Sequence, residues 1–184
     1  GIVWKTIPAG KFTMGASTGK WWEQPAHEVE ISAFQLAQTE TTVAQYRACV
    51  IQGACATPPQ RIAQRRDCTW YKAENETFPM NCVSHPEAQR FCKWAGGGLP
   101  TEAQWEYASR SGPANLDFPW GRGPVTCRHA IIRDASGATG CNGKAYQHRA
   151  WPVCSRPLGN SRQGACDLIG NVFEWTAGVF DARY

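Results

Sequence analysis

The chain has 184 residues, a length that corresponds to one domain with a buried core. Its formal net charge is only +4, and its lysines and arginines are scattered without a basic run, which argues against nucleic-acid binding. No apolar run reaches the length of a membrane span, and no secretory signal peptide is visible. The chain opens directly at its first predicted strand, as a mature or trimmed protein would.

Two stretches near the N-terminus have the pattern of strands. Residues 2–15 carry apolar side chains up to a break at Gly10, and residues 27–39 alternate polar and apolar side chains. The loop between them contains Trp21 and Trp22, a candidate contact surface, although a simple loop role is the favoured interpretation.

Capping residues predict three helices. Thr41 or Thr42 begins the first, over residues 43–50. Ser84 and Glu87 form a capping box for the second, whose core face is predicted to carry Ala88, Phe91, Cys92 and Ala95. Thr101 and Gln104 begin the third, with Trp105 and Ala108 facing inward. The acids Glu40, Glu102 and Glu106 are interpreted as helix-terminus or salt-bridge residues.

Residues 53–80 and 119–163 are predicted to be long loops, and loops of this length are normally functional or tied down. The first contains the arginines of the 61–66 stretch, a second candidate contact surface. It also contains Asn75-Glu76-Thr77, a glycosylation sequon that has meaning only if the source glycosylates.

Nine cysteines are the most informative feature of the composition. None stands in a Cys-x-x-Cys pair, so a zinc ribbon or a thioredoxin-type site is not indicated. Short spacings favour local disulfides that staple loops, which imply an oxidising compartment, although spacing alone does not fix the connectivity. The candidate pairs are Cys49–Cys55, Cys68–Cys82, Cys127–Cys141 and Cys154–Cys166, and Cys92 is the unpaired candidate.

The stretch from Asp167 to Thr176 mixes two carboxylates, a glycine-asparagine turn and large apolar side chains. Asp167 and Glu174 are hard oxygen donors, and a turn at Gly170-Asn171 lets main-chain carbonyls point the same way. Calcium takes six to eight such oxygens. A buried turn with a capped carboxylate is the alternative interpretation, and the residues by themselves leave both open.

Three blocks of the sequence resemble a known family. DLIGNVFEWT (167–176), WAGGGLPTEAQWEYA (94–108) and IPAGKFTMG (7–15) are similar, in this order, to landmarks of the formylglycine-generating enzyme, or sulfatase-modifying factor, superfamily. The resemblance nearly spans the chain. It implies one domain over residues 1–184 with the family's α+β, C-type-lectin-like fold: short antiparallel strands, two to three helices and much loop.

The resemblance also implies a structural calcium site. The family pattern maps onto the side chains of Asp167 and Glu174 and the carbonyls of Gly170 and Val172. In the family, a cysteine placed like Cys92 commonly pairs with one in a final strand, near an end that the 184 residues do not contain.

Activity in the family implies a copper site made of two closely spaced cysteines after the Glu-Trp motif. Copper(I) favours such thiolates. Only ten residues follow Glu174 here and none is a cysteine, and Gly98 stands where the family usually has an arginine. We therefore predict no catalytic residues within these 184 residues.

Two functions remain open from the sequence. The first is a non-catalytic binding or structural module with an extracytoplasmic location, stabilised by calcium and disulfides, with a protein or peptide partner. The alternative is a copper-dependent, oxygen-using formylglycine-generating or related oxidase whose catalytic C-terminal segment lies outside this chain. The oligomeric state and the partner are not encoded in any recognisable pattern.

Overall fold

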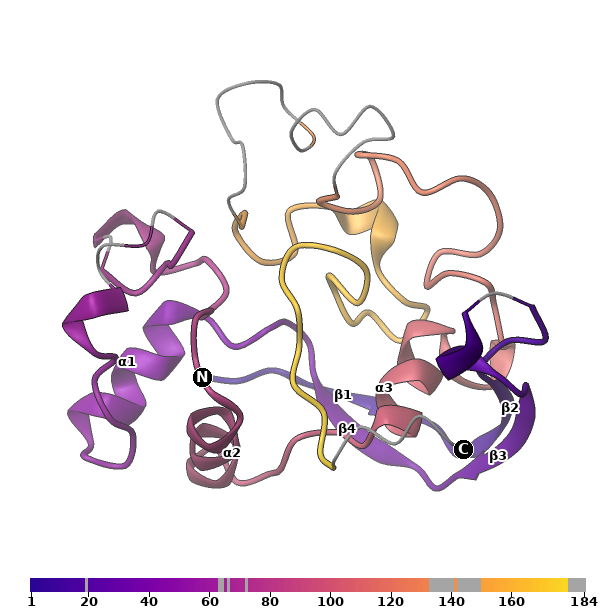
Figure 1. Ribbon diagram of the computed structural model, residues 1–184, viewed down its shortest axis with the longest axis horizontal. Helices are drawn as coiled ribbons and strands as arrows, with labels where there is room; N and C mark the ends of the chain where they lie inside the picture. Colours follow the sequence, from indigo (N-terminus) through magenta and orange to yellow (C-terminus); the bar gives the residue numbers. More distant parts are fainter. Residues whose placement is uncertain are drawn as a thin grey trace.

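The computed structural model of the chain describes residues 1–18, 20–62, 65, 67–71, 73–132, 141 and 150–178 (Figure 1). Within this part the protein forms four short strands and three α-helices, joined by long loops and single turns of 3-10 helix. The predicted α+β class with short antiparallel strands is confirmed. No described helix is long and apolar enough to cross a membrane.

The strands form two separate antiparallel pairs. Strand β1 (Trp4–Ile7) pairs with β4 (Phe34–Ala37), and β2 (Gly10–Met14) pairs with β3 (His27–Ile31). The stretch predicted as one strand over residues 27–39 is therefore two strands. The break falls at the exposed residues Ser32-Ala33, where the chain passes from one sheet to the other.

Helix α3 (Glu102–Ser109) packs on the strands and closes the first core. Its Tyr107 is fully buried, lies 5.2 Å from the Phe12 ring between ring centres, and donates a hydrogen bond of 3.1 Å to the Pro8 carbonyl. The inward prediction for Ala108 is confirmed, whereas Trp105 is only half-buried and Tyr107 takes the central place. The core members are Ile7, Phe12, Met14, Ile31, Tyr107, Ala108, Ala165 and Leu168.

A second core lies between α1 (Val43–Ile51) and α2 (His85–Trp94). The Tyr46 ring stacks on Phe91 with centres 5.8 Å apart and meets Trp70 edge to face at 5.7 Å. The predicted helix starts are confirmed: Thr42 and Thr101 cap α1 and α3, and Ser84 forms a capping box with Glu87 before α2.

Glu106 ties α3 to the loop after β2. Its Oε1 accepts a hydrogen bond of 3.0 Å from the Gly15 backbone N–H and one of 2.9 Å from Arg110 Nε. The salt-bridge interpretation of Glu106 is confirmed, and the same carboxylate also fixes the base of the loop that presents Trp21 and Trp22, of which Trp21 is well exposed.

Eight cysteines form four disulfides, each within one local stretch of chain. The pairs coincide with those that the spacings favoured: Cys49–Cys55, Cys68–Cys82, Cys127–Cys141 and Cys154–Cys166. Cys92, on α2, is the free cysteine and is half-buried. In the arginine-containing stretch over residues 61–66, only 61, 62 and 65 belong to the described part of the chain.

The turn at Gly159 fits closely beneath the loop that contains His129. A Cβ added to Gly159 would lie within 1.8 Å of the His129 backbone oxygen, whereas a Cβ on Gly98 would meet nothing within 4 Å. We therefore expect Gly159→Ala to lower the free energy of unfolding by about 1–3 kcal/mol, as overpacking does. Gly98→Ala is the matched control and should leave it nearly unchanged in denaturant titrations. Equal stability of the two variants would contradict this packing.

Candidate calcium turn and adjoining hollow

The stretch from Asp167 to Asn171 folds as a turn with left-handed backbone. The φ angles are 56° at Asp167, 87° at Gly170 and 56° at Asn171. Gly170 is needed at its position, because a Cβ there would come within 2.4 Å of the Ile131 carbonyl oxygen, with which it shares a parallel bridge. The turn is therefore pressed directly against residues 131–132.

Asn171 fastens this turn to three other segments. Its backbone N–H donates to the Ile131 carbonyl (2.8 Å), and its Oδ1 accepts from the Trp151 backbone N–H (2.8 Å). Its Nδ2 donates to the Trp151 carbonyl (3.2 Å) and to Oε2 of Glu40 (2.8 Å). Every polar atom of the side chain is used, so the orientation of the turn is fixed.

Asp167 is buried beside the Cys154–Cys166 disulfide. Its Oδ2 accepts a hydrogen bond of 2.5 Å from the Cys154 backbone N–H. Burial raises the pKa of this carboxyl above its usual value, while the Cys154 N–H and the charge of Arg156 oppose the rise. Among the described residues, the Asp167 side chain makes this one hydrogen bond, at Oδ2.

Glu174 opens onto a hollow in the surface, yet protein surrounds it closely. Desolvation raises its pKa to about 7 and the charge of Asp167 adds to the rise. The Trp105 indole N–H lies near enough to favour the charged form, although it makes no hydrogen bond of ordinary length and angle. Glu174 and Asp167 therefore belong to one electrostatic neighbourhood.

Glu40 is a member of this neighbourhood that the sequence interpretation missed. It is 8% exposed, and burial, followed by the charges of Asp167 and Glu174, raises its pKa to about 9. Its Oε1 has no hydrogen-bond partner among the residues that the structure describes. The interpretation of Glu40 as a helix-terminus charge is wrong, because its side chain bonds to Asn171, 131 residues along the chain. No local pattern around Glu40 signals a partner so distant.

The oxygen atoms at the turn suit a hard divalent cation. Asp167 and Glu174 supply carboxylates, and no described residue donates a hydrogen bond to the carbonyl oxygens of Gly170 or Val172. Four protein oxygens completed by water fall in the six-to-eight range of calcium. The four residues expected from the sequence lie within one described stretch, and each carries an oxygen donor of the type that calcium takes.

A large hollow of about 2480 Å³ adjoins the turn. Its walls come from β4, from α2 and from the segment 166–178, and the Cys92 side chain is one of its lining groups. The aromatic Phe173 is fully exposed, and Trp175 is 48% exposed. The wall near Trp175 is held in place, since its Nε1 donates to the Val83 carbonyl (3.0 Å) and its ring meets His85 edge to face.

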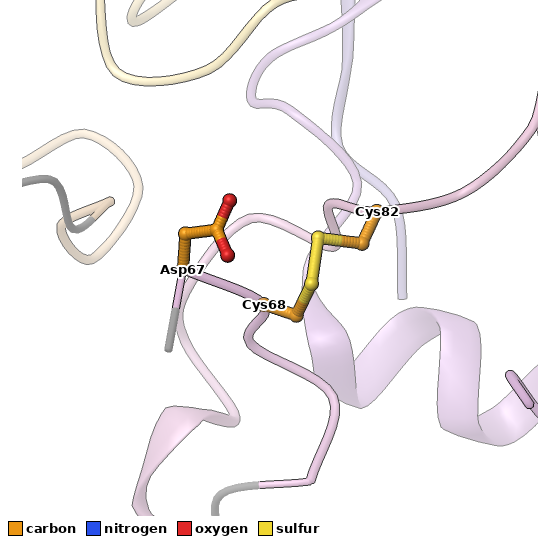
Figure 2. Close-up of side chains that lie close together, drawn as sticks. All are labelled: Asp67, Cys68 and Cys82. Atoms are coloured by element: carbon orange, nitrogen blue, oxygen red, sulfur yellow. A yellow bond between two sulfur atoms is a disulfide. The ribbon is translucent and has the colours of Figure 1, made fainter. Parts of the chain in front are cut away.

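The one group of three potential ligand side chains packed within 4.8 Å in the described part of the chain is Asp67, Cys68 and Cys82 (Figure 2). Figure 2 shows the two sulfur atoms bonded to each other, with the Asp67 carboxylate beside them. A disulfide has no thiolate to offer a metal, so this group is a structural staple.

The sequon at Asn75 is not available in the folded protein. Asn75 is 6% exposed, and its Nδ2 donates to the Thr69 carbonyl at 3.2 Å. We expect the folded protein secreted from a glycosylating host to carry no glycan there, as judged by intact mass. Thr77→Ala, a change at an exposed residue that removes the sequon, should leave the mass unchanged apart from the substitution. A glycopeptide containing Asn75 in the folded fraction would contradict this burial.

Comparison with known proteins gives a consistent family. Residues 4–184 match the family model described as sulfatase-modifying factor enzyme 1-like domain. Hercynine oxygenase of Mycolicibacterium smegmatis is 28% identical over 200 residues, covering 93% of this chain and 44% of that protein. The formylglycine-generating enzyme of Bos taurus is 29% identical over 213 residues, covering 93% of this chain and 56% of that protein.

Another relative is named as lacking activity. The protein named inactive C-alpha-formylglycine-generating enzyme 2 of Bos taurus is 26% identical over 214 residues, covering 96% of this chain and 70% of that protein. Two solved structures share the fold at a TM-score of 0.63. CarF is 17% identical and covers 96% of this chain and 80% of its own, and Treponema denticola variable protein 1 is 19% identical and covers 95% and 72%.

Proposed function

Because the chain belongs to the sulfatase-modifying factor enzyme 1-like family, we propose that it uses the family fold as a non-catalytic binding module outside the cytoplasm. In this proposal a structural calcium ion on the turn at 167–174 and four disulfides stabilise the module. The hollow beside the turn receives a protein or peptide partner. The observation that carries the proposal is the single free thiol of the chain.

The thiol count bears on catalysis because the resemblance ties family activity to two closely spaced copper-binding cysteines. Copper(I) prefers soft thiolate ligands. Eight of the nine cysteines are in disulfides, and burial raises the pKa of the remaining Cys92 thiol, which favours its neutral form. The residues of this chain therefore do not fit a two-thiolate copper site.

The location follows from the same chemistry. Disulfides persist in oxidising compartments and are rare in the cytosol. Four local disulfides in a loop-rich chain are a common feature of proteins that work outside the cytoplasm, and they support the extracytoplasmic assignment.

The calcium ion would be held by the Asp167 and Glu174 carboxylates and by the Gly170 and Val172 carbonyls. A divalent charge there would offset the repulsion by which Asp167 raises the pKa of Glu174 and by which both carboxylates raise the pKa of Glu40. The ion would also stabilise the backbone next to Phe173, which lines the hollow.

The binding surface is the hollow with its aromatic rim. Exposed aromatic side chains such as Phe173 and Trp175 are over-represented at sites of protein recognition. The two-stranded β1–β4 sheet places Phe34–Ala37 along the same hollow, which adds an apolar and partly open strand to its wall. A peptide or protein segment suits a groove of this composition.

The alternative is an oxidase whose copper-binding cysteines lie outside these 184 residues. The half-buried Cys92 favours it, because in the family a cysteine at this position pairs with one further along the chain, and Cys92 lines the hollow. The relatives named as active enzymes are longer than the segment they share with this chain.

Calcium binding tests the structural part of the proposal. We expect isothermal titration to detect binding to the native protein, and saturating calcium at 100 times Kd to stabilise it by about 2.7 kcal/mol. Removal of a residue that supports a metal ligand weakens metal binding by roughly tenfold to a hundredfold. Glu174→Ala removes a proposed ligand itself and should weaken calcium binding by more than that. Glu30→Ala, which removes an exposed carboxylate on β3, is the charge-matched control and should bind normally. No heat of binding and no effect of chelator on the melting temperature would rule the calcium site out.

Copper loading separates the two functions. We expect the native full-length protein, titrated with copper(I) against a competing chelator, to retain no copper, and Cys92→Ser to behave in the same way. Its intact mass and C-terminal peptide map then test whether a pair of nearby cysteines follows Tyr184. Stoichiometric copper retention together with such a pair would replace the binding-module proposal with the oxidase.

A further inference from the structure

We propose that Glu40 is a positioning residue for the turn at 167–174, and that it sets the calcium affinity of that turn without ligating the ion. The inference rests on the proposed calcium site and adds a residue from the first quarter of the chain. Its basis is the 2.8 Å hydrogen bond between Glu40 Oε2 and Asn171 Nδ2, which joins residues 131 positions apart.

The bond matters because Asn171 lies between the two carbonyls of the site. Gly170 and Val172 are its immediate neighbours in sequence, so the direction of both carbonyls depends on the backbone of Asn171. Its other bonds, to Ile131 and Trp151, come from the second half of the chain. Among the bonds of Asn171, the Glu40 bond is the one that connects the turn to the segment between β4 and α1. The Val172 backbone N–H adds to it by favouring the charged form of Glu40.

Glu40 itself stands on a well-fixed segment. Two residues before it, the Gln38 carbonyl accepts a hydrogen bond of 2.8 Å from the Cys166 N–H, next to Asp167. One residue after it, the Thr41 carbonyl accepts a hydrogen bond of 2.7 Å from the Met80 N–H, and Thr42 then caps α1. A carboxyl on such a segment holds its partner in one place.

Positioning fits the distances better than ligation does. The ligand atoms of Glu40, Asp167 and Glu174 do not form a group within 4.8 Å of one another, which is the spread that one ion would bridge. Glu40 is nevertheless more than nine-tenths buried, and within the described part of the chain its Oε1 has no hydrogen-bond partner. Glu40 bonds Asn171, which lies between the two proposed calcium-binding carbonyls. Residues that hydrogen-bond to the surroundings of metal ligands in this way orient the ligands.

The test compares three variants of the full chain by calcium titration and by hydrogen exchange of the 167–176 peptide in chelator. Glu40→Ala should weaken calcium binding by about tenfold to a hundredfold and speed exchange in that peptide. Glu40→Gln keeps an acceptor oxygen for Asn171 and should stay close to the parent in both measurements. Thr69→Val, at a buried hydroxyl bonded to Pro79 and Asn81, should lower the melting temperature while changing neither measurement.

Each outcome decides a different claim. Unchanged exchange and calcium affinity in Glu40→Ala would overturn the positioning role. A Glu40→Gln variant as impaired as Glu40→Ala would also overturn it, because the charge of Glu40 would then matter and not its hydrogen bond. A parent protein that binds no calcium would overturn the calcium site itself. The exchange measurement would still decide whether Glu40 orders the turn.

Discussion

The amide side chain of Asn171 connects parts of the molecule that the backbone ladders leave separate. Both sheets are only two strands wide, and isolated two-stranded pairs are marginal in stability. Neither of them includes the segment 150–178, which carries the turn. That segment is held by Ala165 and Leu168 in the first core, by backbone hydrogen bonds to other segments, by single bridges and by the Cys154–Cys166 disulfide. The turn itself is fixed largely by hydrogen bonds, of which Asn171 makes four.

The carboxyl groups at the turn destabilise it electrostatically. Glu40, Asp167 and Glu174 each have a pKa raised mainly by desolvation, and the neighbouring carboxyls raise those of Glu40 and Glu174 further. Buried like charges are costly unless they are paired or bound to a metal. The Arg156 charge and the Cys154 N–H offset part of the cost at Asp167 only. A divalent cation held by Asp167 and Glu174 would neutralise the two carboxylates whose charges raise the pKa of Glu40, which is why the charge pattern and the carbonyls of Gly170 and Val172 lead to the same proposal.

Features of the fold that depend on neighbouring residues could be predicted from the sequence, whereas features that depend on distant residues could not. Capping pairs such as Thr42 with Gln45 and Thr101 with Gln104 lie three residues apart, so the helix starts were predictable. Disulfides with separations of 6 to 14 residues were predictable from spacing for the same reason. The division of 27–39 into two strands was not, because alternation continues through Ser32-Ala33 while the partner strand changes. The choice of Tyr107 over Trp105 for the core depends on the Pro8 carbonyl, about a hundred residues away.

The same division explains the candidate site. The four proposed calcium donors share an eight-residue stretch, so pattern and resemblance could indicate them, whereas Glu40 reaches the turn only through tertiary structure. Activity is a separate matter from both, since one fold can host several chemistries. The named relatives include an oxygenase, a formylglycine-generating enzyme and an inactive homologue, all at similar identity to this chain. Under the proposed function, the number of free thiols at the hollow, rather than the fold, distinguishes a binding module from an oxidase.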